Sequence, residues 1–555
     1  MSVQATFCAT LVDQWSRLGV TDAVVCPGSR STPLALPLAQ RMRTHVRLDE
    51  RSAAFYAVGL SKATQRPVVI CVTSGTAAAE LHAAVAEAHH ARVPLLVCTA
   101  DRPPELHHTG ASQTIEQDAL FAAEVRWRTD PGVPVAGQEA TWRPLAVRAF
   151  VESRFGERGP GPVHLNLAFR EPLTDGSDEL PAPRAKDVLA AGDAGAVGEA
   201  VESLHPRGLV IVGGPSYGPV DPIPLVAFAE RRGWPVLADP LSGCRVRGTV
   251  AAADAVARTH PPLPETVVLL GAPWLSKALG EYVVAAASAG ARIVVIDPWR
   301  HRPDPLRVAT DFVHADPDAW LEAAAAVEAP PADPDWLPAW RSMDERAQRA
   351  IDETLGTELS EPQVARTAYR HAAAAGASVF VSASMPIRDL EWFAPALPAP
   401  PVVLANRGAN GIDGVVSTAL GVAASGAAPR TLALLGDLAF LHDVSGLVNL
   451  PDVPCTFVVV DNGGGGIFSF LPQATTLAPA VFESLFGTPP TSDLGAVARG
   501  FGLPVTEVSK LSELEPALAS APGHPALVRV RVPSRAENVA VHDALNQAVR
   551  LSLRP

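Results

Sequence analysis

Two oxygen-bearing side chains each follow an apolar run in the last third of the chain. Asp437 comes after TLALLG, and Asn462 follows TFVVVD. Runs of this length and β-branched content predict buried strands, and parallel strands open at their carboxyl ends onto one crevice. A carboxylate, an amide oxygen and a backbone carbonyl suit a Mg²⁺ or Ca²⁺ ion that also takes oxygens from a phosphate group. The pattern predicts a metal-assisted diphosphate site.

The glycine run after Asn462 extends the predicted site. Gly463 to Gly466 lack Cβ atoms, so the turn can be tight and several N–H groups can point at an anion. In the alternative interpretation, Asp437 caps a helix and the glycines form a flexible turn. Each feature alone fits that alternative, but the two features together, each at a strand end, favour the diphosphate site.

Two segments in the first third carry further reactive groups. In HVRLDERSAAF, Glu50 stands at a predicted strand end, directly before a helix. A Glu in this position ordinarily caps the helix or forms a surface salt bridge, whereas one in a dry, apolar setting has a raised pKa and can exchange protons. The TSGTA turn, with Ser74, Gly75 and Thr76, can present hydroxyl and N–H groups to cofactor or substrate anions.

The elements that position these residues follow one recurring sequence pattern: a short β-branched run, a turn rich in Gly, Ser or Asn, and an Ala-rich helical segment. It recurs along the chain and predicts βα units with mostly parallel sheets. Polar stretches at 174–195 and 329–340, rich in Pro and Asp, interrupt it. We therefore expect an α/β fold of three domains with mostly parallel sheets flanked by helices, at 1–180, 196–328 and 345–555.

The composition narrows the class of protein. A chain of 555 residues with 48% hydrophobic and 19% charged residues is globular and too long for a single core. The formal net charge of −13 argues against nucleic-acid binding, which needs a basic face. The N-terminus lacks the pattern of a signal peptide, and no apolar stretch reaches the roughly 20 residues that span a bilayer, so we expect no stable membrane insertion. The 6 Cys residues are scattered without a CxxC pair, which favours a reduced, cytoplasmic compartment.

The paired motif resembles that of a known family. Gly436-Asp437-Leu438, with Asp461-Asn462 downstream, is similar to the diphosphate motif of thiamine-diphosphate enzymes, usually Gly-Asp-Gly…Asn-Asn, with Leu438 and Asp461 as departures. Those enzymes have three α/β domains and hold their cofactor through Mg²⁺ or Mn²⁺. The resemblance implies that Asp437, the Asn462 amide and the Gly464 carbonyl bind the metal. It also implies that Glu50 faces the aminopyrimidine ring, and it implies cofactor contacts at Ser74, Gly75, Thr76, Gly436, Leu438, Gly465, Gly466 and Ile467.

Segments spread over the first and last domains narrow the resemblance: CPGSRSTPL, LDERSA, TSGTA, ADRPPEL, ASMPIRDL, NRGANGIDG, GDLAFLHD and NGGGGIF. They resemble the family of 2-succinyl-5-enolpyruvyl-6-hydroxy-3-cyclohexene-1-carboxylate synthases (MenD) of menaquinone biosynthesis. Those transferases decarboxylate 2-oxoglutarate on thiamine diphosphate and add the succinyl carbanion equivalent, an aldehyde-type or ketone-type group, to isochorismate in a 1,4-addition. The resemblance also implies a homodimer or homotetramer, with each cofactor between the first domain of one subunit and the third domain of its partner.

Substrates that together bring four carboxylates call for fixed guanidinium groups, because Arg binds a carboxylate in a bidentate fork. The matching segments supply Arg30, Arg102, Arg388 and Arg407, each after a strand-like run. Two departures from the family concern isochorismate: Ser112 replaces an Asn, and Ala278 replaces a cation. Similarity to the family implies the remaining roles: substrate hydrogen bonds from Ser29 and Ser384, isochorismate contacts from Ser112, Gln113 and Lys277, and an apolar wall of Ile467 and Phe468.

Three alternatives stand beside this interpretation: a different thiamine-dependent decarboxylase or lyase of a 2-oxo acid, a non-catalytic diphosphate-binding regulator, and a nicotinamide dehydrogenase. Against the last, VIVGGPSYG in the middle domain lacks the G-x-G-x-x-G fingerprint, so this domain is expected to have lost any cofactor site. His107-His108 resembles the relay of thiamine-dependent pyruvate decarboxylases, which release an aldehyde, although such a pair in a polar loop is usually solvated. His89-His90 lies on a predicted helix and is expected to be structural or to lie on the surface.

Overall fold

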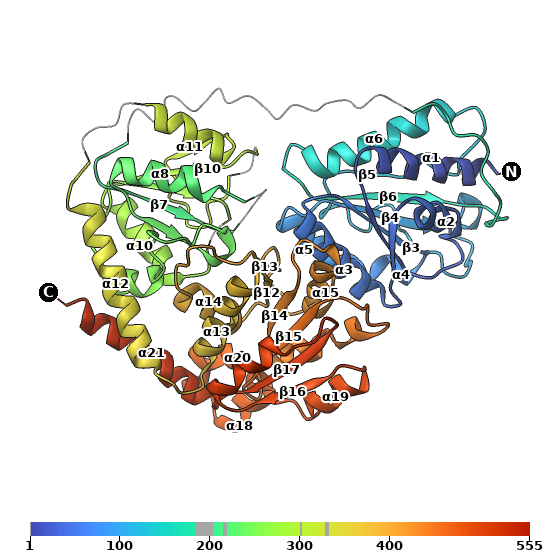
Figure 1. The fold of residues 1–555 in the computed structure, drawn as a ribbon. Helices are drawn as coiled ribbons and strands as arrows, with labels where there is room; N and C mark the ends of the chain where they lie inside the picture. The colour runs from blue at the N-terminus through green and yellow to red at the C-terminus, as the bar shows by residue number, and fades with distance from the viewer. Residues whose placement is uncertain are drawn as a thin grey trace. The chain divides into compact units, whose positions relative to one another are not determined.

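The computed structural model describes residues 2–183, 204–214, 219–272, 274–299, 302–327 and 332–554. Parts of both predicted linkers lie outside these residues, as does the predicted start of the middle domain. The described chain forms three parallel sheets of six, five and six strands, flanked by helices (Figure 1). The predicted fold class, α/β with three mostly parallel sheets, is therefore confirmed.

The first sheet has the strand order β2-β1-β3-β4-β6-β5, with all pairs parallel. Its central strands β3 and β4 are buried along their whole length because both faces are covered. Helices α1, α2 and α6 share a core with one face, and α3 packs with α5 on the other (Figure 1). The strands are β1 (Asp22–Val25), β2 (Arg43–Val46), β3 (Val68–Val72), β4 (Leu95–Asp101), β5 (Arg128–Thr129) and β6 (Pro162–Ala168). The helices are α1 (Val3–Arg17), α2 (Thr32–Arg41), α3 (Glu50–Thr64), α4 (Thr76–Ala79), α5 (His82–His90), η1 (Pro104–Leu106) and α6 (Glu139–Phe155).

The second sheet has the order β11-β10-β9-β7-β8 and is again parallel. Several of its helices begin at an Asp or Ser whose side chain accepts a backbone N–H, the usual N-cap arrangement. The strands are β7 (Gly208–Val212), β8 (Val236–Ala238), β9 (Thr266–Leu270), β10 (Arg292–Ile296) and β11 (Asp311–Val313). The helices are α8 (Pro222–Arg232), η2 (Pro240–Ser242), α9 (Ala253–Ala257), α10 (Lys277–Ser288), α11 (Pro317–Ala326) and α12 (Trp336–Leu355).

The third sheet has the order β13-β12-β14-β15-β17-β16, all parallel. Its strands are β12 (Ser378–Val381), β13 (Val403–Ala405), β14 (Thr431–Gly436), β15 (Cys455–Asp461), β16 (Val505–Val508) and β17 (Ala526–Arg531). The helices up to β15 are α13 (Glu361–Ala375), α14 (Met385–Phe393), α15 (Val415–Ser425), α16 (Asp437–His442) and η3 (Val444–Leu447). Those after β15 are η4 (Gly466–Phe470), α17 (Gln473–Thr476), α18 (Pro479–Phe482), η5 (Glu483–Gly487), α19 (Leu494–Gly500), α20 (Leu511–Ala519) and α21 (Arg535–Ser552).

The first and third sheets are wound in the same way, strand for strand. In both, the winding reverses between the first and third strands, β1 and β3 in one sheet and β12 and β14 in the other. Ligands of open α/β sheets bind outside the carboxyl ends of the strands at such a switch point. The loops that follow these four strands carry Arg30, Ser74, Ser384 and Asp437, so the winding brings predicted site residues to the two switch points.

The chain divides into two compact units. The first unit joins the first sheet to residues 406–427 and 442–453, and the second unit holds the second and third sheets. The first unit is built this way because α15 packs closely along α3. A Cβ on Gly59 would overlap the carbonyl oxygen of Thr418, and a Cβ on Gly421 would overlap that of Tyr56.

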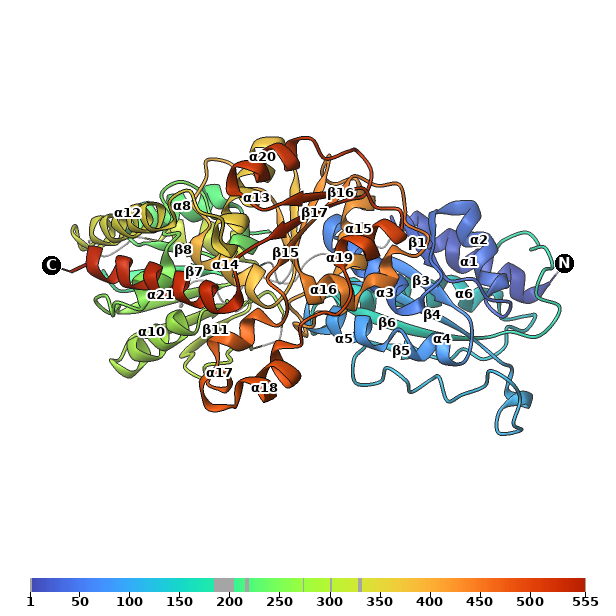
Figure 2. The same cartoon turned by 90° about the horizontal axis from the view of Figure 1, so that it is seen from below.

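In the second unit, α12 and α21 lie side by side over the second sheet's core (Figures 1 and 2). Trp336 and Trp340 of α12 and Leu545 and Val549 of α21 belong to one buried cluster with β7, β9 and β10. The last helix of the chain, α21, therefore contributes side chains to the hydrophobic core beside the second sheet. Among the described residues, no helix combines the length and the apolar character needed to cross a membrane.

Candidate active site

Asp437 and Asn462 lie at one edge of the third sheet, because β14 and β15 are parallel neighbours. The Asp437 side chain is 2% exposed. Its Oδ1 accepts a hydrogen bond from the Leu438 N–H (2.7 Å), and its Oδ2 accepts one from the Gly464 N–H (2.8 Å). Burial raises the pKa of Asp437 to about 6. A carboxylate removed from water in this way favours a bound cation.

The Asn462 amide is held at one end only. Its Nδ2 donates to Oε1 of Glu361 (2.8 Å), whereas its Oδ1 is buried and has no hydrogen-bond donor among the described residues. An unsatisfied amide oxygen beside a buried carboxylate is a fitting pair of hard ligands for a divalent cation. The described residues contain no cluster of three His, Cys, Asp or Glu side chains suited to a metal, so a metal here depends on the amide and on a backbone carbonyl.

The glycine run differs from our expectation. Its N–H groups do not point at an open anion site: those of Gly464, Gly465 and Gly466 donate to Asp437, to the Gly487 carbonyl (2.8 Å) and to the Gly464 carbonyl (2.9 Å). The glycines are needed for shape instead. Gly464 has φ +136°, and a Cβ there would overlap the Gly487 carbonyl oxygen. The Gly464 carbonyl keeps a second lone pair with which it can meet a cation.

Asp461, the departure from the usual Asn of the motif, is neutralised by Arg529. The Arg529 Nε lies 2.7 Å from Asp461 Oδ2, and its Nη1 lies 3.0 Å from Asp493 Oδ2. The Asp461 carboxylate is therefore engaged across the strand pair β15–β17. Because Asp461 is paired with Arg529, Asp437 is the acidic residue of the predicted metal pair.

Ile467 and Phe468 lie in η4, directly after the glycine turn. The Phe468 ring packs against Phe486 of η5, with ring centroids 5.5 Å apart. Both predicted wall residues are partly exposed. Their place next to Asn462 agrees with an apolar surface beside the predicted cofactor.

In the first unit, three loops meet at the carboxyl ends of β1, β3 and β4. A Cβ on Gly28 would overlap the side chain of Thr73, so the CPGSR and TSGTA turns are in direct contact. Gln113, which has φ +54°, donates from Nε2 to the Ser74 carbonyl (3.4 Å). The structure therefore gathers the predicted residues Arg30, Ser74 and Gln113 around one switch point.

Arg30 and Arg102 bring two guanidinium groups near each other in these loops. Arg30 donates to the Phe169 carbonyl (2.9 Å) and to Glu171 Oε1 (3.3 Å). The Nε atoms of Arg30 and Arg102 are buried and have no hydrogen-bond acceptor among the described residues. Burial, and then the charge of Arg102, lower the pKa of Arg30. Two guanidinium groups near enough to repel one another favour an anion between them.

A buried glutamine holds the TSGTA turn. The Gln117 Oε1 accepts the Gly75 N–H (2.7 Å), and its Nε2 donates to the Asn166 side chain (2.9 Å). The Ser74 hydroxyl is buried and has no hydrogen-bond partner among the described residues, whereas Thr76 is exposed at the start of α4. The Ser74 hydroxyl is thus available to a ligand of this loop.

Glu50 is the first residue of α3, and the cap of that helix is its neighbour Asp49, which accepts the Ser52 N–H (2.7 Å). Glu50 is therefore not the helix cap. Burial raises the pKa of Glu50, and the Asp49 and Glu80 carboxylates add to the effect. Beside it, the buried Arg47 donates to backbone carbonyls of the 442–453 segment. Glu50 is thus a half-buried carboxyl on a firmly anchored helix start.

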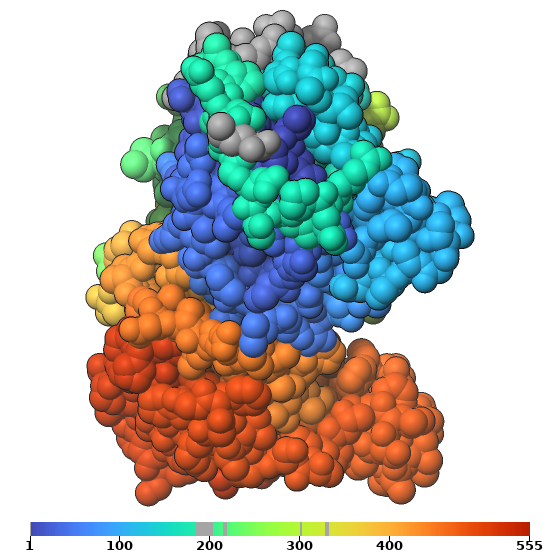
Figure 3. Space-filling view, turned by 90° about the vertical axis from the view of Figure 1, so that its right-hand side faces the viewer, coloured from blue at the N-terminus to red at the C-terminus, as the bar shows by residue number. Residues whose placement is uncertain are grey.

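The segment between β4 and β5, drawn in light blue, projects from the body of the first unit (Figure 3). Ser112 and Gln113 on it are exposed, as is Ser29 in the CPGSR turn. His108 is also exposed, whereas the His107 ring lies 3.0 Å from the Arg102 carbonyl oxygen. His107 therefore contacts the Arg102 loop, and His108 faces solvent.

Arg407 is flanked by a buried ion pair. Lys62 and Glu87 lie 2.9 Å apart, and Lys62 also donates to the Asn406 side chain (3.1 Å). Glu87 accepts the N–H groups of Gly408 (3.1 Å) and Ala409 (2.7 Å). The residues on both sides of Arg407 are thereby tied to α3 and α5.

Ser384 and Arg388 lie at the switch point of the third sheet. Ser384 has φ +75°, a left-handed conformation that is strained for a residue with a Cβ and that concentrates at functional sites. The Arg388 Nη1 donates to the Ser384 carbonyl (2.6 Å). The strained turn and the guanidinium thus form one feature at the start of α14.

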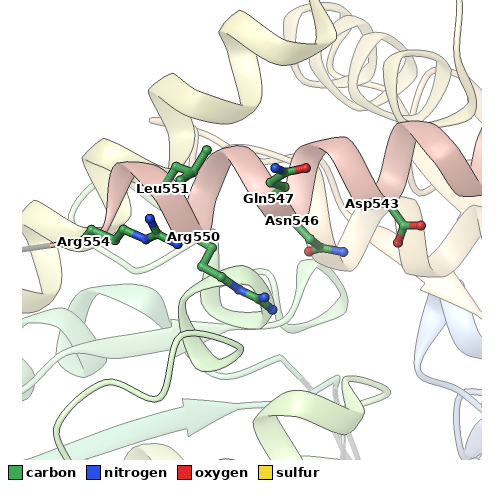
Figure 4. Close-up of a pocket in the computed structure, with 6 residues that line it drawn as sticks. All are labelled: Asp543, Asn546, Gln547, Arg550, Leu551 and Arg554. Atoms are coloured by element: carbon green, nitrogen blue, oxygen red, sulfur yellow. The ribbon is translucent and has the colours of Figure 1, made fainter.

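Lys277 lies elsewhere in the second unit, in a groove between α10 and α21. Its Nζ is exposed and lies 3.4 Å from Glu281 Oε1. A smaller pocket of about 340 Å³ runs along α21 next to it, and Figure 4 shows the six residues that line it. None of the predicted metal or diphosphate residues lines either pocket. The groove has a volume of about 800 Å³, and the charged or titratable side chains that line it are Arg258, His260, Lys277, Glu281, Tyr282, Asp543 and Arg550.

The switch point of the second sheet is closed. A Cβ on Gly213 would overlap the Ala272 carbonyl oxygen, and the Ala272 N–H donates to the Gly214 carbonyl (2.8 Å). The turns after β7 and β9 therefore pack backbone against backbone where a cofactor would enter. That the middle domain has lost a cofactor site stays a prediction.

The predicted residues thus fall into two sets, one in each unit. The polar residues that sequence reasoning missed are buried, and their partners lie far away in the sequence or carry no motif of their own, so the fold is needed to reveal them. The first unit holds Ser29, Arg30, Glu50, Ser74, Gly75, Thr76, Arg102, Ser112, Gln113 and Arg407, and the second holds Lys277, Ser384, Arg388, Gly436, Asp437, Leu438, Asn462, Gly464, Gly465, Gly466, Ile467 and Phe468. The residues that were missed are Arg47, Lys62, Glu87, Gln117 and Glu361.

Three family models match the chain in order. Residues 5–120 match the N-terminal TPP-binding domain of thiamine pyrophosphate enzymes. Residues 197–381 match the middle domain of thiamine pyrophosphate enzymes, and residues 392–530 match their C-terminal TPP-binding domain. The N-terminal match covers β1 to β4, and the C-terminal match covers β13 to β16 and most of β17, including the strands that lead to Asp437 and Asn462.

Curated relatives match along nearly the whole chain. The 2-succinyl-5-enolpyruvyl-6-hydroxy-3-cyclohexene-1-carboxylate synthase of Thermobifida fusca is 43% identical, with 100% of both chains covered. The protein of the same name from Chloroflexus aurantiacus is 40% identical over 96% of this chain and 94% of its own. That from Bacillus velezensis is 38% identical over 89% of each.

Proposed function

The chain belongs to the 2-succinyl-5-enolpyruvyl-6-hydroxy-3-cyclohexene-1-carboxylate synthase family of thiamine-diphosphate enzymes, and we propose that it makes this product in menaquinone biosynthesis. In the proposed reaction 2-oxoglutarate loses CO₂, and the remaining succinyl group is added to isochorismate. The observation that carries the proposal is the pair Arg30 and Arg102, whose Nε atoms are buried and have no acceptor among the described residues. Such a pair suits polyanionic substrates.

Thiamine diphosphate, when bound, supplies the electron sink that stabilises the carbanion left by CO₂. Asp437, the Asn462 Oδ1 and the Gly464 carbonyl would hold Mg²⁺ or Mn²⁺, and through it the diphosphate. The Glu50 carboxyl has a raised pKa, so it can hold a proton and donate a hydrogen bond to a ring nitrogen. Arg30 and Arg102 bind carboxylates, and Ile467 and Phe468 exclude water.

We further propose that two chains share each site, in a homodimer or homotetramer that works in the cytoplasm. Val46 and Leu48, just before Glu50, are 54% and 50% exposed, and such apolar side chains fit an interface between subunits. All six cysteines are free and buried, which suits a reducing compartment. One chain would supply Glu50 and its partner Asp437.

Mixing two inactive variants tests the shared site. Glu50→Gln and Asp437→Ala each remove activity, but a mixed dimer of the two has one site with both changes and one site with neither. Random exchange of subunits is therefore expected to restore about a quarter of the wild-type activity. A mixture that stays inactive after complete subunit exchange contradicts the shared site.

A product assay with thiamine diphosphate, Mg²⁺, 2-oxoglutarate and isochorismate tests the reaction. We expect the condensation product, and accumulation of succinic semialdehyde without it would identify a simple decarboxylase. Arg102→Ala should lower kcat/KM by about 10- to 100-fold, because a charge-assisted contact contributes about 1.5–3 kcal/mol. Arg128→Ala is the matched control, since Arg128 is exposed and pairs with Asp118 on the surface.

A further inference from the structure

Glu361 is an acidic residue in an unusual place. It is the first residue of α13, where a carboxylate normally faces solvent and interacts with the helix dipole. Here Glu361 is 3% exposed, so its carboxyl has lost water that hydrogen bonds must replace. The helix does not need it as a cap, because Ser360 accepts the Gln363 N–H. The burial therefore calls for another explanation.

The side-chain partner of the Glu361 carboxyl is the Asn462 amide, whose Nδ2 donates to Glu361 Oε1 (2.8 Å). A carboxylate has only acceptor oxygens, so with Glu361 ionised this contact selects the NH₂ end of the Asn462 amide.

The opposite end of the same amide is Oδ1, which is buried and has no donor among the described residues. A buried amide oxygen without a partner is costly, and a free amide would rotate to exchange its two ends. Exchange is blocked here, because it would place Oδ1 against the acceptor oxygen of Glu361. The unsatisfied oxygen is thus held in position.

Asp389 of α14 and His542 of α21 lie near enough to Glu361 to act on its charge. The buried His542 lies 2.8 Å from Asp389 Oδ1, and its Nδ1 donates to the Asn538 carbonyl (2.9 Å). The His542 ring also packs on Phe470 at the end of η4, with ring centroids 4.9 Å apart. Through His542, helix α21 therefore contacts both Asp389 and the end of η4, which follows the glycine turn after Asn462.

We propose that Glu361 is a positioning residue for the metal: it fixes the Asn462 amide so that Oδ1 faces the cation. The inference rests on the proposed function, since it requires a metal at Asp437 and Asn462. Glu361 itself acts through the asparagine. Loss of such an outer hydrogen bond typically weakens metal binding by about 10- to 100-fold.

The test is a Mn²⁺ titration of the full chain at saturating thiamine diphosphate, with free Mn²⁺ measured by electron paramagnetic resonance. Glu361→Met removes the acceptor and is expected to weaken Mn²⁺ binding by about 10- to 100-fold. Glu361→Gln keeps an acceptor oxygen but adds an NH₂ donor that can hold the other end of the amide, so it should weaken Mn²⁺ binding less than Glu361→Met does. Equal weakening by both variants would show that charge is what matters, and would overturn the proposal.

Two controls separate folding and function from positioning. Glu139→Met changes the partly exposed first residue of α6 and should leave Mn²⁺ affinity unchanged. Without metal, the Glu361→Met variant should unfold at the same temperature as the wild type or at a higher one, because an apolar side chain replaces a buried carboxyl. If Asp437→Ala binds Mn²⁺ like wild type, the proposed function fails. If Asp437→Ala loses the metal while Glu361→Met keeps it, only the role of Glu361 is refuted.

Discussion

The close crossing of α3 and α15 can be tested by adding one methyl group. In Gly59→Ala, the new Cβ would lie 2.9 Å from the Val422 nitrogen and would overlap the Thr418 carbonyl oxygen. Both are backbone atoms, so no flexible side chain can move aside. The helices must separate, and α3 is the helix that begins with Glu50.

The magnitude follows from two opposing effects. Ala is favoured over Gly inside a helix by about 1 kcal/mol. Overpacking costs about 1–3 kcal/mol, and the upper end applies when the overlap is with backbone. We expect a net loss of about 2 kcal/mol in the local opening free energy, which corresponds to a factor of about 30 in the opening equilibrium.

Hydrogen exchange of the α3 and α15 amides measures this loss, and it does so without assuming that a chain with two compact units unfolds in one step. Gly280→Ala in α10 is the control, because its Cβ would meet Leu306 Cδ2 at an ordinary 3.5 Å. That change should slow exchange in α10 by about fivefold through helix propensity alone. Unchanged or slower exchange of α3 in Gly59→Ala would refute the tight crossing.

Three further changes have defined outcomes. Asp437→Ala should release thiamine diphosphate as EDTA does, and retention of the cofactor in equilibrium dialysis would count against the metal site. His164 is buried and its pKa is lowered to about 4, so its stabilising effect is present above its unfolded pKa of about 6.5 and is lost as the pH falls. Between pH 7 and pH 5 the loss is about 2 kcal/mol, and thermal denaturation of His164→Gln should show a shallower pH dependence. Arg245 donates to three backbone carbonyls at the end of α14 and to the Ala238 carbonyl of β8, and Arg245→Lys, which cannot reach all of them, should cost about 2–4 kcal/mol in hydrogen exchange of α14. Unaltered exchange there would contradict this reading of the contact.

The metal pair was predictable because it depends on local pattern. TLALLG and TFVVVD are buried strands, and parallel neighbours bring their carboxyl ends to one edge, so Asp437 and Asn462 had to lie near each other. The same rule places Arg30 and Ser74 at the switch point of the first sheet. Strand ends are fixed by short-range sequence, which is why the motifs and the fold class were found.

Long-range partners were not predictable. Glu361 and Asn462 are 101 residues apart in the sequence. Nothing in the local sequence Ser360-Glu361-Pro362 distinguishes a buried carboxyl from an ordinary acidic residue in the first turn of a helix. The Arg529 that neutralises Asp461 comes from another strand, β17. The glycine turn was interpreted as an anion cradle because the sequence does not show that Gly487 would accept one of its N–H groups.

The grouping of elements into compact units was also not predictable from the sequence. Sequence rhythm assigns residues 345–555 to one domain, and that boundary stays a prediction. The compact units nevertheless follow packing, and α15 belongs with α3. The small residues Gly59 and Gly421 allow this contact, but neither stands out in an Ala-rich and Gly-rich sequence. Helix pairing across several hundred residues is a property of the folded chain alone.

The packing of α3 against α15 also sets an order of events during synthesis. The ribosome completes α3 roughly 350 residues before α15, which at 5–20 residues per second is a delay of about 20 to 70 s. During that time the face of α3 that carries Gly59 has no native partner. The first compact unit therefore completes its native packing only after residues 406–427 have been synthesised.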